Sequence, residues 1–138
     1  MPYAGDLTPQ QAYQLVFEGS GAVLVDVRTR AEWTYVGTPV LPAPGAQVVL
    51  LEWQSFPGNT TNPAFMAQLA ASGVRPDAPV AFICRSGVRS AAAAEAATAA
   101  GYVAAYNVSD GFEGPTDAEG HRGRIAGWKV AGLPWRQT

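Results

Sequence analysis

The chain has 138 residues, of which 48% are hydrophobic and only 14% are charged, and its formal net charge is −2. A chain of this length can bury the core of one domain, and we expect one domain over residues 1–138 with its core between about 7 and 135. The weak negative charge excludes the basic surface that binds nucleic acid. No apolar run approaches the length of a membrane span, so we expect neither nucleic acid nor a membrane as a partner.

The chain contains a single cysteine, Cys84, so no internal disulfide can form. This agrees with a reducing compartment, and the first residues lack the basic and apolar regions of a signal peptide. We therefore expect a cytoplasmic protein. One cysteine and one histidine without ligand spacing give no support for a metal site, and no motif indicates a cofactor.

The first half of the chain begins with a predicted helix and two predicted strands. The segment Thr8-Pro9-Gln10-Gln11 supplies an N-cap, a proline at the first helical position and a capping-box glutamine, for a helix that ends near Gly19. Residues 22–27 form an apolar run broken only by Asp26, which is typical of a strand covered on both faces. Residues 47–51 offer a second strand of this kind.

The second half continues the alternation of helix and strand. Asn62-Pro63 is predicted to cap a helix that runs through Ala71. Residues 79–84 form a buried strand, residues 88–100 an alanine-rich helix closed by Gly101, and residues 102–108 a further strand, as the sequence shows.

Alternating strands and helices predict an α/β fold with a mostly parallel central sheet and helices on both faces. In such a sheet the ligand lies at the carboxyl ends of the strands. Asp26, Cys84 and residues 109–111 all fall at these ends. The long polar loop 111–127 follows the last strand, so we expect it to border the cysteine.

Cys84 stands between a predicted strand and a predicted helix. The strand ends at Cys84 and the helix begins near Val88, which leaves Arg85-Ser86-Gly87 in a tight turn. Backbone N–H groups of such a turn can converge on the sulfur, with the positive end of the helix dipole behind them. These groups, together with the guanidiniums of Arg85 and Arg89, stabilise a thiolate, which makes Cys84 a candidate nucleophile.

The whole loop, Cys84-Arg85-Ser86-Gly87-Val88-Arg89-Ser90, resembles the active-site loop of the rhodanese sulfurtransferase family. Other segments resemble further motifs of that family, in its order. They are Val23-Leu24-Val25-Asp26-Val27-Arg28, Ala31-Glu32-Trp33, Pro44-Gly45-Ala46, and Gly127-Trp128 with Gly132-Leu133-Pro134. The chain departs from the family in lacking the His-Ile that often precedes Pro-Gly-Ala, and the Gly-Gly pair that commonly follows the last strand.

The resemblance implies a single rhodanese-like domain with sulfurtransferase activity. Cys84 would take a sulfane sulfur from a small anion such as thiosulfate, hold it as a persulfide, and pass it to a thiol, cyanide or a protein acceptor. The amides from Arg85 to Ser90 would bind the anion and then the persulfide, by the logic of an oxyanion hole. Arg85 would face the mouth of the site and attract the donor.

Three residues are expected to support this loop: Asp26, Arg28 and Glu32. Arg89 lies at the start of a helix, where a cation opposes the dipole, so it requires a carboxylate partner. Asp26 and Glu32 are the candidates, and a pair between Arg89 and Asp26 would brace the loop. Arg28 and Glu32, four residues apart, could instead form a plain local ion pair.

Two other functions remain open. Tyrosine-type phosphatases and rhodanese-fold phosphatases place five residues between the cysteine and the arginine, whereas four separate Cys84 from Arg89. The smaller cradle favours sulfur transfer over a phosphatase or arsenate reductase. A binding or sensor module that keeps the fold without turnover is the third possibility.

Overall fold

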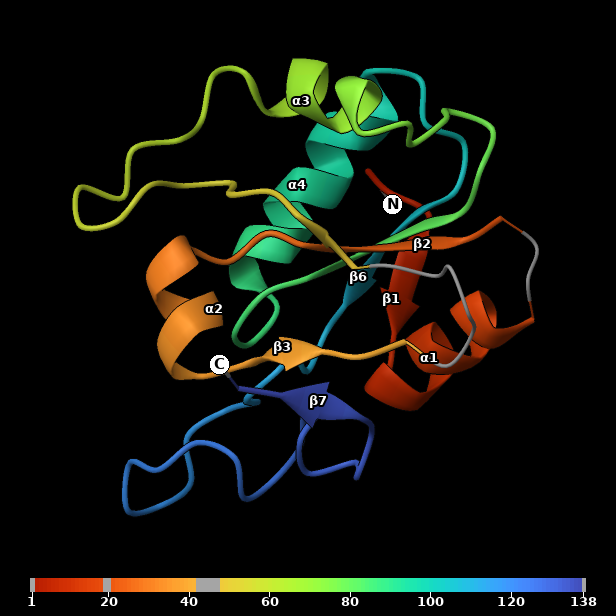
Figure 1. The fold of residues 1–138 in the computed structure, drawn as a ribbon. Coiled ribbons are helices and arrows are strands. Elements are labelled where there is room, and N and C mark those ends of the chain that lie inside the picture. Colours follow the sequence, from red (N-terminus) through yellow and green to blue (C-terminus); the bar gives the residue numbers. More distant parts are fainter. Residues whose placement is uncertain (1, 19–20, 42–47, 138) are drawn as a thin grey trace.

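The computed structural model describes residues 2–18, 21–41 and 48–137 (Figure 1). Its centre is a five-stranded sheet in the order β1-β6-β5-β2-β4, in which every neighbouring pair is parallel. The strands are β1 (Gly5–Leu7), β2 (Val23–Asp26), β4 (Val49–Leu50), β5 (Val80–Ile83) and β6 (Ala105–Val108). A small antiparallel sheet pairs β3 (Thr38–Pro39) with β7 (Trp135–Arg136).

Four helices are described, and three of them cover the two faces of the large sheet. They are α1 (Pro9–Phe17), α2 (Arg30–Tyr35), α3 (Phe65–Ala71) and α4 (Val88–Ala99). Leu24 of β2 and Ile83 of β5 pack with α1, whereas Val25 and Phe82 pack with α3 and α4. Helix α1 therefore lies on one face of the sheet, and α3 and α4 lie on the other (Figure 1). Because side chains alternate along a strand, a sheet covered twice needs continuous apolar runs. The predicted α/β class, with a parallel sheet and helices on both faces, is confirmed.

Side-chain hydrogen bonds to backbone amides determine where α1 and α3 begin. In α1 the Gln11 amide donates to Thr8 Oγ1 at 3.1 Å, and the Thr8 amide donates to Gln11 Oε1 at 2.8 Å, which completes the predicted capping box. The helix ends at Phe17, and the predicted end at Gly19 lies outside the described residues. The prediction for α3 was wrong by two residues, because Asn62 Oδ1 accepts the Ala64 amide at 3.0 Å and forms a turn before the helix begins.

The strand predictions were correct in place but too long. Strand β6 begins at Ala105 rather than Tyr102, because the Tyr102 amide donates to Ala97 O at 3.0 Å and closes the end of α4. Strand β4 covers Val49–Leu50 of the predicted 47–51. Residue 47 and the Pro44-Gly45-Ala46 motif lie outside the described residues. Among the residues described, no helix is long and apolar enough to span a membrane.

Several short elements were not predicted: β1, β3, β7 and α2. The sequence does carry a signal for α2, since Thr29 and Glu32 form a second capping box. The Glu32 amide donates to Thr29 Oγ1 at 3.3 Å, and the Arg30 amide donates to Glu52 Oε2 at 2.9 Å. Strands of two or three residues are too short for a periodic pattern, so only their partners reveal them.

The segment after β6 binds the cysteine loop through its backbone. The Phe112 amide donates to Cys84 O at 2.8 Å, and the amides of Glu113 and Gly114 both donate to Arg85 O at 3.1 Å. Gly111 has a φ of +70°, and a Cβ there would overlap the Arg85 carbonyl. Glycine is therefore required at this position both by the backbone angle and by the close approach.

We predict that Gly111→Ala destabilises the protein by about 1–3 kcal/mol more than Gly101→Ala. Gly101 is the matched control, because its φ is +103° but nothing lies within 4 Å of a Cβ built there. Its substitution carries the left-handed strain alone, about 1 kcal/mol. Denaturant unfolding measures both losses. Equal losses would show that the close approach to Arg85 does not constrain the loop.

Candidate active site

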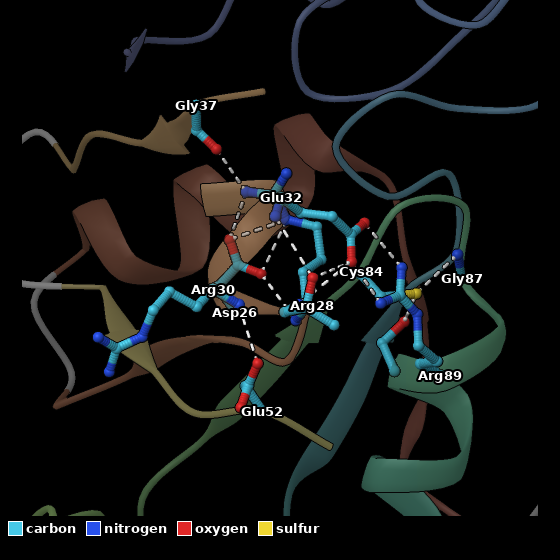
Figure 2. Close-up of polar contacts among 11 residues, drawn as sticks. Asp26, Arg28, Arg30, Glu32, Gly37, Glu52, Cys84, Gly87 and Arg89 are labelled. Atoms are coloured by element: carbon cyan, nitrogen blue, oxygen red, sulfur yellow. Dashed lines mark hydrogen bonds and ion pairs between the residues drawn. The ribbon is translucent and has the colours of Figure 1, made fainter. Parts of the chain in front are cut away.

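The sulfur of Cys84 lies in the turn between β5 and α4, and the residue is only 1% exposed. Gly87, the N-cap of α4, has a φ of +103°, which points its N–H at Cys84 Sγ over 3.1 Å (Figure 2). Ser90 Oγ lies 3.2 Å from the same sulfur. An amide and a hydroxyl of the loop thus contact the thiol, at the helix end where negative charge is favoured.

Cys84 lines an open cavity of about 830 Å³. Besides Cys84, four parts of the chain form the wall: α2 with the residues at its two ends, the segment that follows β4, the rest of the cysteine loop with the start of α4, and the late loop after β6. The lining residues are Thr29, Ala31, Glu32 and Val36, then Gln54, Phe56 and Asn59, then Arg85, Ser86, Val88 and Arg89, and finally Glu113 and Arg122.

The sequence-predicted residues divide between this cavity and the interior. Glu32 and most of the loop from Cys84 to Arg89 line the cavity, while Ser90, Asp26 and Arg28 are fully buried. Glu113 and Arg122 place the late loop beside the cysteine, as expected. Gln54, Phe56 and Asn59 were missed, because no chemical motif distinguishes that segment from an ordinary connection.

Arg89 pairs with Glu32 in a two-pronged contact at the cavity wall. Arg89 Nη1 donates to Glu32 Oε1 at 2.6 Å and Nη2 donates to Oε2 at 2.9 Å (Figure 2). Burial raises the pKa of Glu32, but the hydrogen bonds and the charge of Arg89 outweigh it, so the pKa lies below its ordinary value. The hydrogen bond to Glu32 in turn raises the pKa of Arg89. The pair fixes α2 against the cysteine loop.

Of the two carboxylates that were candidates for Arg89, the structure selects Glu32, so neither the pair of Asp26 with Arg89 nor the local pair of Arg28 with Glu32 forms. Arg28 binds Asp26 instead, with Nη2 2.7 Å from Oδ2 and Nε 3.0 Å from Oδ1, and both side chains are 0% exposed (Figure 2). Asp26 lies two residues beyond Leu24, so its side chain leaves β2 on the α1 face. Arg89 belongs to α4, which covers the other face.

The buried Arg28 makes two more contacts. Its Nη2 donates to Gly37 O at 2.6 Å, and its guanidinium carbon lies 4.3 Å from the centre of the Phe112 ring. Asp26 and Arg28 therefore connect the end of β2 to the start of β3 and to the segment after β6. They support the site from beneath and do not line the cavity.

With this geometry established, the comparison with known proteins identifies the family. The model of the rhodanese-like domain matches residues 8–118, so the chain belongs to the rhodanese-like domain family. The chain is similar to the crystal structure of Rv0390 from M. tuberculosis, with 54% identity, 99% of each chain covered and a TM-score of 0.88.

Two further matches are more distant. An uncharacterized protein of Rickettsia conorii is 39% identical over 129 residues, which cover 91% of this chain and 92% of that protein. The solution structure of the polysulfide-sulfur transferase homodimer from Wolinella succinogenes matches with 25% identity and a TM-score of 0.65, over 96% of this chain and 78% of that one.

We predict that Asp26→Asn lowers the free energy of unfolding by about 3–5 kcal/mol, because it leaves a buried guanidinium without its counter-ion. Adding Arg28→Met should recover part of the loss, since it removes the stranded charge and keeps the volume. Adding Arg89→Met should not. Thermal unfolding of the two double mutants shows which arginine is the partner of Asp26. Recovery with Arg89→Met but not with Arg28→Met would mean that Asp26 pairs with Arg89, contrary to the structure.

The pair of Glu32 and Arg89 should make stability depend on pH. Because the folded pKa of Glu32 is lowered, the pair stabilises above the ordinary carboxyl pKa, and this contribution is lost as pH falls through the folded value. Glu32→Gln should cost about 1–3 kcal/mol near neutral pH and progressively less below about pH 4.

The exposed pair of Asp77 and Arg75 provides the matched control for this measurement, because its side chains are 69% and 76% exposed. Solvent screens such a pair, so Asp77→Asn should change the free energy of unfolding by less than about 0.5 kcal/mol, both near neutral pH and below about pH 4. Denaturant unfolding at the two pH values tests both variants. A Glu32→Gln loss that does not shrink in acid would contradict the assignment.

Proposed function

We propose that this protein is a sulfurtransferase that carries a sulfane sulfur on Cys84. The observation that carries the proposal is the environment of the sulfur, where the Gly87 amide at 3.1 Å stands at the N-terminus of the twelve-residue helix α4. That environment favours negative charge, both on a thiolate and on the terminal sulfur of a persulfide. Membership of the rhodanese-like family and the likeness to a polysulfide-sulfur transferase support it.

The reaction proceeds in two displacements at sulfur. The Cys84 thiolate attacks the sulfane sulfur of thiosulfate or a related donor, the S–S bond of the donor breaks, and sulfite leaves with the electron pair. Cys84 is then a persulfide. A thiophilic acceptor, such as cyanide or a thiolate, attacks the terminal sulfur, the bond to Sγ breaks, and the Cys84 thiolate is regenerated.

Different arginines of the cavity attract an anionic donor and shape the cavity wall. Arg85 is exposed where it lines the cavity, so its charge can draw an anionic donor toward the sulfur. Arg122 donates its Nη1 to Gly114 O at 2.8 Å and adds positive charge on the side of the late loop. Arg89 is held by Glu32 and therefore shapes the wall.

Sulfur transfer agrees with this site better than phosphoryl transfer does. A phosphatase of this kind needs an arginine whose forked donors bind the phosphoryl oxygens. In this chain both terminal nitrogens of Arg89 donate to Glu32. Only four residues separate Cys84 from Arg89, which leaves a cradle one residue smaller than that of the phosphatases.

Intact mass measurement after incubation with thiosulfate tests the proposal. The wild-type chain should gain the mass of one sulfur atom, and cyanide should remove it with formation of thiocyanate. Cys84→Ser should gain nothing, because a serine hydroxyl is not ionised at neutral pH and forms no persulfide. The variant is nearly isosteric, so its unfolding curve should match that of the wild type.

The same preparation distinguishes the other functions. Hydrolysis of an aryl phosphate that disappears in Cys84→Ser, without any sulfur gain, would assign the site to a phosphatase. An absence of both reactions would indicate a binding or sensor module, and either result would overturn the proposal.

A further inference from the structure

A chain of hydrogen bonds leads from Cys84 through the interior to the edge of the sheet. Ser90 Oγ lies 3.2 Å from Cys84 Sγ and donates to Asn107 Oδ1 at 2.6 Å. Asn107 Nδ2 donates to Asp6 Oδ1 at 3.2 Å, and Tyr3 donates its hydroxyl to the same oxygen at 2.8 Å. Asp6 and Asn107 are partners in the register of β1 and β6, which lie side by side (Figure 1).

Asp6 determines which group donates and which accepts at each hydrogen bond of this series. A carboxylate only accepts hydrogen bonds, so Asn107 must present its amide nitrogen to Asp6 and its amide oxygen to Ser90. Ser90 has one hydroxyl proton, and that proton is donated to Asn107. Toward the sulfur Ser90 can then only accept, which requires the proton of that contact to come from a Cys84 thiol.

We propose that Asp6 and Asn107 are positioning residues that bias Cys84 toward its protonated form at rest. Ionisation of Cys84 sends the thiol proton to solvent through the cavity, and the thiolate is best stabilised when Ser90 turns its proton to the sulfur. That rotation leaves the oxygen of Asn107, which is 4% exposed, without its donor. The cost of a buried unsatisfied acceptor thus opposes thiolate formation.

Two further observations support this assignment. Ser90 and Asn107 are buried, so water does not readily replace the bonds that the rotation breaks. Asp6 lies in the edge strand β1, which pairs with β6, so the hydrogen bonds reach the sulfur from the edge of the central sheet. The inference takes from the proposed function only that Cys84 reacts as a thiolate.

The effect of nearby charges on thiolate formation must be distinguished from the effect of the hydrogen bonds between Cys84 and Asp6. Arg89 interacts with Cys84 and also with Asp26 and Glu32, and Glu95 of α4 interacts with Tyr3. The hydrogen bond to Asp6 raises the pKa of Tyr3. The negative charge of Asp6 would by itself disfavour a thiolate through space, so loss of that charge and loss of the bond direction predict changes of the same sign.

The test is a pH titration of the thiolate by its ultraviolet absorbance, in which the spectrum of the same variant carrying Cys84→Ser is subtracted each time. Cys84 is the only cysteine, so the difference reports one group, and no reagent has to enter the cavity. Asp6→Asn keeps the size of the side chain and can present an amide nitrogen to Asn107, which releases Ser90. We expect about threefold to tenfold more thiolate at pH values below the midpoint.

Two control variants isolate the hydrogen-bond chain. In a Ser90→Ala background the effect of Asp6→Asn should shrink to the part that the lost charge causes, because no hydroxyl remains to transmit the hydrogen-bond direction. Glu95→Gln removes a charge near Tyr3 but leaves the hydrogen bonds between Cys84 and Asp6 intact, so it should leave the thiolate fraction unchanged. If Asp6→Asn alters the fold, seen in its unfolding curve, Asp6→Ser serves instead, since its hydroxyl can donate or accept.

An unchanged thiolate fraction in the folded Asp6 variant overturns the proposal. So does an equal increase in the Ser90→Ala background, which would assign the effect to charge alone. The titration requires no sulfur donor, so it gives its answer even if the protein takes up no sulfur from thiosulfate.

Discussion

The left-handed backbone at Gly87, with a φ of +103°, is the constraint on which the site depends. It turns the chain from β5 into α4 within four residues and directs an amide at Cys84 Sγ. A Cβ at this position would overlap the carbonyl of Ser109, so the turn also permits the segment after β6 to approach. The backbone bonds from Phe112, Glu113 and Gly114 then hold the loop. One glycine thus links Cys84, helix α4 and the late loop.

The two arginine–carboxylate pairs of the site have different physical roles. Asp26 and Arg28 are fully buried beneath the α1 face, where removal of either partner strands a charge. Glu32 and Arg89 line the cavity and are about four-fifths buried, so their attraction is strong enough to lower the pKa of Glu32. The first pair secures the ends of β2 and β3, and the second shapes the wall beside the sulfur. The sulfur itself is bounded by an amide that favours negative charge and by a hydroxyl whose proton is directed elsewhere.

Much of the fold and the core of the candidate site could be predicted from sequence, because their signals are local. The capping box at Thr8, the apolar runs of β2 and β5, and the turn before α4 each depend on residues a few positions apart. The cavity was predicted less completely. Phe56 and its neighbours reach it from a loop that has no periodicity, and β1 brings Asp6 to Asn107 across a sequence distance that no local pattern bridges.

The sequence by itself therefore determined the α/β class, the position of Cys84 between strand and helix, and the glycine turn around it, since backbone angles and hydrogen bonds of neighbouring residues decide these features. Tertiary structure alone decided which carboxylate meets Arg89. Asp26 and Glu32 both offer a carboxylate, but Asp26 leaves β2 on the face away from α4, while α2 carries Glu32 to the cavity. The choice of partner depends on sheet faces and strand order, which the chain acquires only when its distant segments pack together.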